Sequence, residues 1–343
     1  MKTKAAILLK QNQALVLDDI EIPILKNGQV LVRILASGIC RSQLNEYQGL
    51  KGPDPYLPHL LGHEGAGIVE VTTPGVKKVK PGDYVVVTWI KGKGMEVAGT
   101  QYRWGERLVN SGALASLSEY AVISENRVVK ISKKIMPAVA ALLGCAIPTG
   151  GGMVFNTLNV KKGTSLAVFG VGGIGGAAIL AARMSRCKTI IGVDVFESKL
   201  KFARDLGATH RINAREQDTS VMLKKNFPSG LDYAIESSGN YQAMEQAFSV
   251  IQDQGTLVIA GNLPKGQKIA IDPFDLIKGK RILGTWGGET VPDRDIPKYV
   301  RAYLSKKLLL EKLITHRFPF EKINQALSVL ISGQAAGRIV IEF

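Results

Sequence analysis

Residues 165–175, SLAVFGVGGIG, decide the fold of this chain. Five residues typical of a buried strand run into glycines spaced G-x-G-x-x-G, and an alanine-rich stretch of helical composition follows. In this setting the first glycine permits a tight turn, the second lets a pyrophosphate approach the backbone, and the third lets the helix pack on the strand. Free N–H groups at the start of the helix then bind the phosphates. The motif therefore predicts a dinucleotide site with the loop residues Gly170, Gly172, Gly173, Ile174 and Gly175.

The kind of dinucleotide is predicted from Asp194, which directly follows the next β-like run, residues 189–193. A carboxylate at this distance from the glycine loop can bind a ribose 2′-hydroxyl, and it would repel a 2′-phosphate. No arginine follows directly, because the next three residues are Val195, Phe196 and Glu197. We therefore expect NAD rather than NADP.

The segments on either side of the loop extend this pattern. Further β-like runs at 232–235 and 256–260 have plausible helices between them, which predicts a parallel sheet covered on both faces. The first third of the chain has short β-like runs between Gly and Pro residues instead, as is typical of a compact mostly-β domain. Those runs are 29–35, 67–71, 83–87, 120–122 and 127–131. After Trp286 we expect one or two helices and a closing strand at 337–343.

Together these patterns predict an α/β protein with a doubly wound Rossmann domain inserted in a mostly-β catalytic domain. A chain of 343 residues is too long for one ordinary core, so two domains are expected. The expected segments are residues 1–147 for the first part of the catalytic domain, 148–286 for the NAD-binding domain, and 287–343 for the return to the catalytic domain.

Composition disfavours several other classes of protein. No window approaches the roughly 18 uninterrupted apolar residues of a membrane span, and the start of the sequence turns polar too early for a secretory signal. The net charge of +15 comes from lysines scattered in pairs rather than gathered in one stripe, so nucleic-acid binding is disfavoured. Only three cysteines occur, which argues against a disulfide framework. We predict a cytoplasmic protein with reduced thiols.

Two of these cysteines and one histidine suit a metal site. Cys40, His63 and Cys145 are far apart in sequence, and three protein ligands with a fourth position left open are how a catalytic zinc is held. Cys187 lies between a helix and a strand and is interpreted as a small buried apolar residue. His59 is close to His63, but the neighbouring prolines indicate an extended loop, so we expect it to be structural or pocket-lining.

The segments that carry these residues resemble the zinc-containing alcohol dehydrogenases of the medium-chain dehydrogenase/reductase family. The similarity covers nearly the whole chain in order. Its motifs are GICRS at 38–42, GHEGAG at 62–67, VKPGDYV at 79–85, SEYAVIS at 118–124, LGCAIPTG at 143–150, the glycine loop, and GRIVIEF at 337–343. The resemblance implies a GroES-like catalytic domain. It also implies an NAD- and zinc-dependent enzyme that transfers hydride between an alcohol, or its aldehyde or ketone, and NAD.

The resemblance also assigns roles to individual residues. Cys40, His63 and Cys145 carry over as the zinc ligands, with Glu64 as a nearby carboxylate able to approach the metal. Ser42 falls where the family places the hydroxyl that accepts the proton of the alcohol. The remaining assignments are Arg41 and Arg338 at the cofactor pyrophosphate, Thr149 near the nicotinamide, Lys199 beside the adenosine ribose, and Trp89 in the wall of the substrate pocket.

Three positions depart from the family pattern. No cysteine lies between Cys40 and Cys145, and residues 91–97 read KGKGMEV, so the second, structural zinc of the family cannot form and one zinc per chain is expected. Gln43 replaces an aspartate that orients the zinc-bound histidine; its amide can still accept a hydrogen bond from His63. Asn45 replaces a histidine that passes the proton to solvent in some relatives, so the proton must leave by another route.

Several alternatives stay open. A zinc-free quinone or enoyl reductase would share the fold, but it would not need the three ligands. Sugar and polyol dehydrogenases are closer, although they commonly have a carboxylate in place of Cys145. A catalytically silent binding protein on this fold is the alternative from another class. The sequence leaves open the alcohol, the physiological direction, and the choice between a homodimer and a homotetramer, which would form through an edge strand at 281–285.

Overall fold

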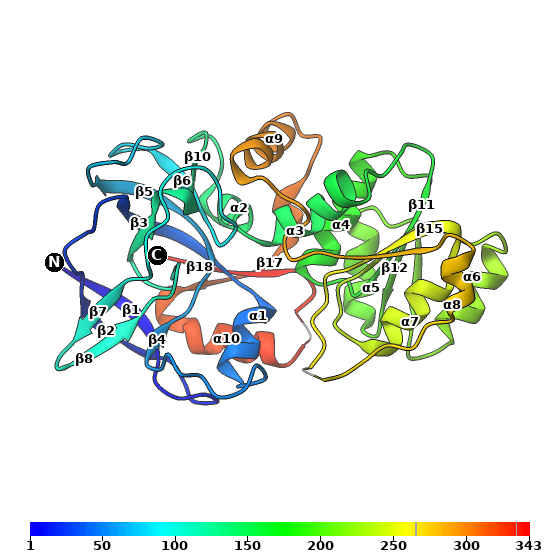
Figure 1. The fold of residues 1–343 in the computed structure, drawn as a ribbon, viewed down its shortest axis with the longest axis horizontal. Helices are drawn as coiled ribbons and strands as arrows, with labels where there is room; N and C mark the ends of the chain where they lie inside the picture. Colours follow the sequence, from blue (N-terminus) through cyan, green and yellow to red (C-terminus); the bar gives the residue numbers. More distant parts are fainter. Residues whose placement is uncertain (265, 334) are drawn as a thin grey trace.

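The computed structural model describes residues 1–264, 266–333 and 335–343. Figure 1 shows two lobes arranged along the long axis of the molecule. The N-terminal third and the C-terminal end of the chain share the strand-rich lobe, while the middle of the chain, green to yellow, forms the other lobe. This arrangement is the one predicted for an inserted domain. The boundaries at 147/148 and 286/287 stay a prediction.

The lobe from the middle of the chain is built on a six-stranded sheet in which every neighbouring pair is parallel. The strand order is β13-β12-β11-β14-β15-β16, with the bounds β11 Ser165–Phe169, β12 Thr189–Asp194, β13 His210–Asn213, β14 Leu231–Glu236, β15 Ile251–Ile259 and β16 Arg281–Gly284. The chain winds outward from β11 to β13 and then returns to β14 on the other side of β11. Ligands of such sheets bind at the carboxyl ends of the strands where this reversal occurs.

Helices cover both faces of this sheet. They are α4 Gly173–Met184, α5 Glu197–Leu206, α6 Thr219–Asn226, α7 Tyr241–Ser249 and α8 Pro273–Ile277. Successive side chains of a strand point to opposite faces. Accordingly, Leu166 and Val168 of β11 belong to one hydrophobic core, and Ala167 and Phe169 belong to another. The strand is therefore buried on both sides, as its apolar sequence predicts.

The strand-rich lobe combines a closed barrel with a larger sheet. The barrel order is β1-β2-β7-β8-β4, with β1 Lys2–Leu8, β2 Val16–Glu21, β7 Gln101–Trp104, β8 Arg107–Asn110 and β4 His59–Leu60. The sheet order is β10-β6-β5-β3-β18-β17, with β10 Val128–Lys130, β6 Tyr84–Thr88, β5 Glu64–Thr72, β3 Gln29–Ile39, β18 Arg338–Glu342 and β17 Ile314–Pro319, and β9 Tyr120–Ser124 also pairs with β3. Ile339 of β18 pairs with Ile39 of β3, so the last strand of the chain returns to the neighbourhood of Cys40.

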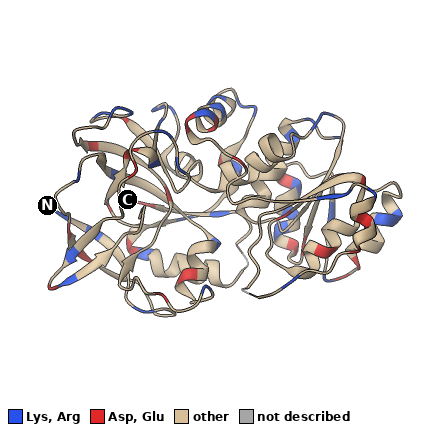
Figure 2. Ribbon diagram, viewed as in Figure 1, with Lys and Arg blue, Asp and Glu red and all other residues tan. Residues whose placement is uncertain are grey.

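The remaining helices lie around this lobe and between the two lobes. They are α1 Arg41–Tyr47, α2 Pro137–Leu142, α3 Ala146–Gly152, α9 Pro292–Leu304 and α10 Ile323–Ile331, with the short turns η1 Glu125–Arg127, η2 Met153–Thr157, η3 Leu310–Leu313 and η4 Phe320–Lys322. Within the described ranges, no helix combines the length and apolar character needed to cross a membrane. Figure 2 shows Lys and Arg scattered over both lobes among Asp and Glu, without a single basic stripe.

Candidate functional site

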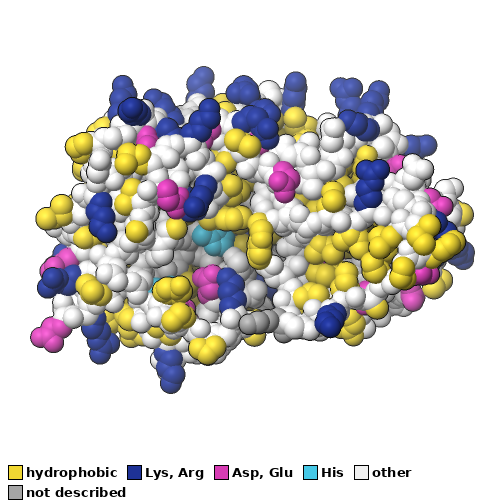
Figure 3. All heavy atoms as spheres, viewed as in Figure 1, with side chains coloured by type: hydrophobic (Ala, Val, Ile, Leu, Met, Phe, Trp, Pro, Cys, Tyr) yellow, Lys and Arg dark blue, Asp and Glu magenta, His cyan; other side chains and the backbone are white. Residues whose placement is uncertain are grey.

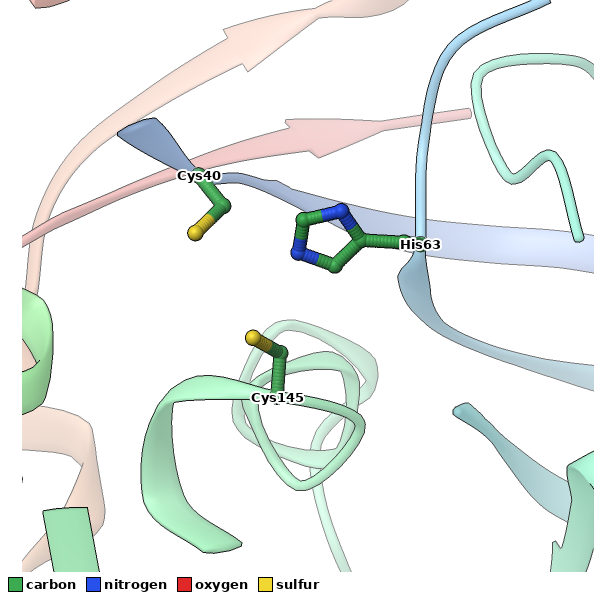
Figure 4. Close-up of side chains that lie close together, drawn as sticks. All are labelled: Cys40, His63 and Cys145. Carbon is green, nitrogen blue, oxygen red and sulfur yellow. The ribbon is translucent and has the colours of Figure 1, made fainter. Parts of the chain in front are cut away.

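Three potential metal ligands meet between the lobes. Cys40 follows β3, His63 precedes β5, and Cys145 precedes α3. Their sulfur and ring nitrogen atoms all lie within 4.8 Å of one another, and Figure 4 shows the three side chains converging on a common point. Nε2 of His63 is buried and has no hydrogen-bond partner among the described residues. Two sulfurs and one imidazole nitrogen are donors that suit tetrahedral zinc and leave its fourth position open.

The two thiols of this set influence each other. Contact with Cys145, together with the positive charge of Arg338 and the neighbouring His63, holds the pKa of the Cys40 thiol well below its ordinary value despite burial. Contact with Cys40 and burial raise the pKa of Cys145, more than Trp89 and Thr149 lower it. Metal ligands must be deprotonated to bind, so the environment favours the thiolate at Cys40.

A buried ion pair connects the metal ligands to the nucleotide loop. Glu64 directly follows His63, and one of its carboxylate oxygens accepts the backbone N–H of Ala146, next to Cys145, at 3.2 Å. The other oxygen pairs with the guanidinium of Arg338, and both side chains are almost fully buried. A Cβ atom at Gly173 would collide with the side chain of Arg338. Arg338 therefore lies against the glycine loop, where the sequence places it near a pyrophosphate.

Gln43 can accept a hydrogen bond from His63 by its chemistry, but its side-chain oxygen has another partner in the structure. Its side-chain oxygen accepts the backbone N–H of Cys40 at 2.8 Å, and no hydrogen bond joins it to His63 within the described residues. The amide orientation follows from this contact, because only the oxygen can face an N–H donor. Nε2 of Gln43 is buried and has no partner in the described part of the chain. The amide therefore stabilises the start of α1 rather than orienting the imidazole.

The glycine loop has the geometry that its sequence predicts. Gly170 has a φ of +85°, and its carbonyl accepts the hydroxyl of Ser237 at 2.8 Å. A Cβ atom at Gly175 would collide with the same carbonyl, so the start of α4 can approach β11 only with glycine there. The N-terminus of α4 thus lies at the carboxyl end of β11, where the reversal of winding places a ligand.

Asp194 lies at the end of β12 and is bonded to the same loop. One carboxylate oxygen accepts the backbone N–H of Val171 at 2.8 Å. The other accepts the N–H groups of Val195 at 2.8 Å and Phe196 at 3.2 Å. These bonds hold the carboxylate beside the loop, in the place where the sequence predicts a ribose contact.

Two cations lie close to Phe196, two residues after this carboxylate. The Lys199 ammonium lies 4.7 Å from the ring centre of Phe196, and the Arg215 guanidinium lies 4.9 Å from the same ring. Burial lowers the pKa of Lys199, against the raising effect of Asp194, and Arg41 lowers it further. Lys199 is therefore near Asp194, and Arg41 is near Lys199. Arg215 was missed, because it follows β13 and no local motif connects it with Asp194.

Glu236 is a second residue that the sequence interpretation missed. It ends β14 beside the glycine loop and is fully buried, and burial raises its pKa against the lowering effect of hydrogen bonds from Ser238 and Gly239. One carboxylate oxygen accepts the N–H of Ser238 at 2.6 Å and the N–H of Gly239 at 2.9 Å. A Cβ atom at Gly170 would collide with Ser238, so Glu236 fixes a turn that packs directly on the nucleotide loop.

A cavity of about 780 Å³ opens beside the metal ligands in the strand-rich lobe. Gln43 and His63 line one part of it, and residues 51–56, 99–101 and 110–114 line much of the rest. His59 also lines it, as predicted, and forms an ion pair with Asp54 at 2.7 Å. The Asp54 partner was not anticipated, because its Pro-rich segment gives no sign of the contact.

Trp89 follows β6 and its indole is close enough to Cys145 to affect the pKa of that thiol. The ring also approaches Gly287, where an added Cβ atom would lie 3.4 Å from it. Trp89 is therefore placed between the metal ligands and the segment that follows β16.

Ser42 is the second residue of α1, two positions after Cys40, and Thr149 donates its backbone N–H to the Cys145 carbonyl at 3.0 Å.

The loop at 91–97 is held by carboxylates. Glu125 is buried and accepts the backbone N–H groups of Lys77 at 2.5 Å, Lys78 at 2.7 Å and Met95 at 2.9 Å. Glu96 pairs with Arg127 at 3.1 Å. We call Glu96 and Glu125 the carboxylate clamp. It connects the loop to β9 and β10 through direct polar contacts.

Two family models match the chain: "Alcohol dehydrogenase GroES-like domain" over residues 26–133 and "Zinc-binding dehydrogenase" over residues 173–305. Among solved structures, an alcohol dehydrogenase zinc-binding domain protein from Burkholderia ambifaria is 31% identical with a TM-score of 0.92, covering 100% of this chain and 99% of that chain. Benzyl alcohol dehydrogenase from Acinetobacter calcoaceticus is 30% identical with a TM-score of 0.90 and the same coverage. The 2R,3R-butanediol dehydrogenase from Bacillus subtilis is 25% identical, with a TM-score of 0.81 and 99% of both chains covered.

Proposed function

The chain belongs to the zinc-containing alcohol dehydrogenases of the medium-chain dehydrogenase/reductase family, and from this premise we propose an NAD-dependent alcohol dehydrogenase that carries one zinc. Its strand-rich lobe is GroES-like, and its parallel sheet is the Rossmann-like domain of the family. The observation that carries the proposal is the convergence of Cys40, His63 and Cys145, with Nε2 of His63 buried and unpartnered. The reaction transfers hydride between an alcohol, or its carbonyl product, and the nicotinamide.

Each site residue has a proposed task in this reaction. Zinc held by Cys40, His63 and Cys145 supplies a Lewis acid that favours deprotonation of an alcohol. Ser42 accepts the alcohol proton, and Glu64 adjoins the ligands and can approach the metal position during ligand exchange. Trp89 forms part of the pocket wall and excludes water there. These assignments follow the family pattern, and the positions of Glu64 and Trp89 beside the ligands support theirs.

The cofactor residues are proposed on the same basis. Asp194 and Lys199 bind the adenosine ribose, and Arg41 and Arg338 bind the pyrophosphate. Thr149 positions the nicotinamide, and the phosphates lie on Gly170, Gly172, Gly173, Ile174 and Gly175 at the start of α4. We prefer NAD to NADP, because the Asp194 carboxylate would repel a 2′-phosphate. Support comes from the hydrogen bond that fixes Asp194 beside the loop.

We propose a single zinc per chain, without a structural zinc. The sequence has no cysteine between Cys40 and Cys145. The carboxylate clamp holds the 91–97 loop through Glu96 and Glu125 instead. Metal analysis of purified protein should give one zinc per chain, and two would contradict the proposal.

The edge of the parallel sheet supports self-association. β16 is the last strand of the sheet, and Leu283 on it and Trp286 after it are exposed. Phe274 and Ile277 on α8 are exposed as well, and Figure 3 shows hydrophobic side chains gathered over this lobe. We propose a homodimer or homotetramer that pairs β16 with a second copy. In sedimentation experiments the wild type should be an oligomer and the Leu283→Asp variant a monomer. A monomeric wild type would refute the proposed self-association.

The partners are a small alcohol or carbonyl compound and the nicotinamide cofactor, with no role for nucleic acid and a cytoplasmic location. The direct test is an NAD-linked activity screen over primary alcohols, secondary alcohols and polyols, with and without added zinc. We expect turnover that a chelator abolishes and zinc restores. A protein that holds zinc and NAD but oxidises none of these alcohols, and reduces none of the matching carbonyls, would contradict the proposal.

A further inference from the structure

We propose that the alcohol oxidised by this chain carries a second, hydrogen-bond-donating group, a hydroxyl or an ammonium, which binds to Asp54. The inference rests on the dehydrogenase function proposed above. It starts from the cavity beside the metal ligands, because His63 and the Asp54–His59 pair line the same 780 Å³ space. A substrate whose carbinol end is at the metal ligands therefore extends past Asp54 and His59.

The His59 ring has no hydrogen-bonding atom left for a substrate. Nε2 faces the Asp54 carboxylate at 2.7 Å, and Nδ1 faces the backbone carbonyl of Leu60 at 3.0 Å. Both partners are acceptors, so both bonds form when each ring nitrogen carries a hydrogen. His59 therefore orients Asp54 and is a positioning residue.

Asp54 still has acceptor capacity. Its second carboxylate oxygen accepts the N–H of Tyr56 at 2.9 Å, and the first accepts His59. An ionised carboxylate offers about four acceptor sites, so roughly two remain for a ligand. The pair can therefore accept hydrogen bonds from a substrate but cannot donate any. An ether, ester or carboxylate on the substrate would gain nothing there, whereas a hydroxyl or ammonium would.

Because Asp54 is largely buried, its free acceptor sites affect how tightly a substrate binds. The side chains of Asp54 and His59 are each 12% exposed. The other ion pair in the cavity wall, Lys51 with Glu46, is 52% and 36% exposed and keeps its water when a substrate binds. An alkyl group packed against Asp54 leaves the remaining acceptor sites of this charged group without a hydrogen bond, which costs at least about tenfold in affinity.

The geometry limits where the second group lies. His63 comes four positions after His59, and a chain of that length spans at most about 14 Å. Both side chains face one cavity, so the two ends of the substrate are several bonds apart. A linear α,ω-diol of suitable length satisfies this condition, while a simple primary alcohol does not.

The test compares kcat/KM across four matched sets of three to seven carbons: 1-alcohols, α,ω-diols, ω-amino alcohols and ω-methoxy alcohols. We expect one chain length at which the diol or the amino alcohol exceeds the 1-alcohol at least about tenfold, while the methoxy compound does not. The better of the two donors identifies the second group as hydroxyl or ammonium. Equal values for diol, amino alcohol and 1-alcohol at every length overturn the inference.

Variants distinguish a role of Asp54 in substrate binding from a role in supporting its loop. Asp54→Asn and His59→Gln should bring the ratio of diol to 1-alcohol, or of amino alcohol to 1-alcohol, close to one. His210→Gln, which changes an exposed imidazole on β13, is the matched control and should keep the ratio. If Asp54→Asn lowers kcat/KM for all substrates in parallel and leaves the ratio unchanged, Asp54 only supports its loop and the inference is wrong. Absence of activity with every alcohol would instead contradict the dehydrogenase proposal itself.

Discussion

Arg338 of the last strand forms a buried ion pair with Glu64, the residue that follows the metal ligand His63. Glu64 also accepts the N–H of Ala146 beside Cys145, and Arg338 lies against Gly173 of the glycine loop. The pair thus joins four segments of the chain, those of Glu64, Ala146, Gly173 and Arg338, into one site. Its partners come from both lobes, so the ion pair couples the metal ligands to the nucleotide loop.

Replacing Arg338 by Met should destabilise the protein strongly. The change leaves the Glu64 carboxylate buried without its partner, which costs about 3–5 kcal/mol in the free energy of unfolding. Urea denaturation measures this loss. The double variant Arg338→Met with Glu64→Gln should recover part of it, because no buried charge remains unpaired. An unchanged unfolding free energy for the single variant would show that the pair contributes nothing.

Substitution of Cys40 by Ser should abolish activity through loss of zinc. A hydroxyl is a poor substitute for a thiolate, and the environment favours the thiolate at this position. Metal analysis and NAD-linked turnover should fall together. Cys187→Ser is the matched control, since Cys187 lies half-buried beside Thr164 and outside the ligand set. Normal turnover of a zinc-free Cys40→Ser protein would refute the catalytic role of the metal.

Asp194→Gly should reduce the preference for NAD over NADP. A hydrogen bond to a charged group contributes about 1.5–3 kcal/mol, so the ratio of the two kcat/KM values should change roughly tenfold to a hundredfold. Asp194→Asn distinguishes loss of the negative charge from loss of the hydrogen bond to the loop, because the amide is neutral while its oxygen can still accept the N–H of Val171. If both variants keep the wild-type ratio, Asp194 does not bind the ribose.

Glu236→Gln should change how stability depends on pH. Burial raises the pKa of Glu236 in the folded protein, so the folded state binds the proton more tightly than the unfolded chain. The resulting stabilisation is complete below the ordinary carboxyl pKa and is lost as pH rises through the raised value. Each unit of that rise is worth about 1.4 kcal/mol. Unfolding of the Gln variant should therefore depend less on pH between acidic and neutral conditions, and an identical dependence would contradict this account.

The strongly periodic parts of the fold could be predicted from the sequence. The run 165–169 is β11, residue for residue, because four successive apolar residues before a glycine loop leave little choice. The helix expected from 177 begins earlier, at Gly173, since Gly173 and Gly175 of the loop are already part of α4. β7 and β8 were not predicted, because these four-residue strands carry exposed polar side chains and are defined only by their pairing in the barrel.

The site was predictable where motifs are local and unpredictable where contacts are distant. Cys40, His63 and Cys145 were found because each lies in a characteristic segment, and the structure brings them together. Arg215 beside Phe196 and Asp54 beside His59 depend on how loops fold back, which no spacing in the chain encodes. The sequence left open whether the amide of Gln43 contacts His63, and in the structure the N–H of Cys40 is bonded to the amide oxygen.

Because the carboxylate clamp holds the 91–97 loop without a metal ion, we expect folding of this protein to be independent of the zinc that catalysis needs. Where a structural metal would cross-link the 91–97 loop, Glu96 and Glu125 use side-chain oxygens that no chelator removes. Metal-free protein should therefore stay folded and accept other divalent ions at its three-ligand site. Cobalt, whose visible spectrum reports on tetrahedral thiolate coordination, could then serve as a probe of the site in solution.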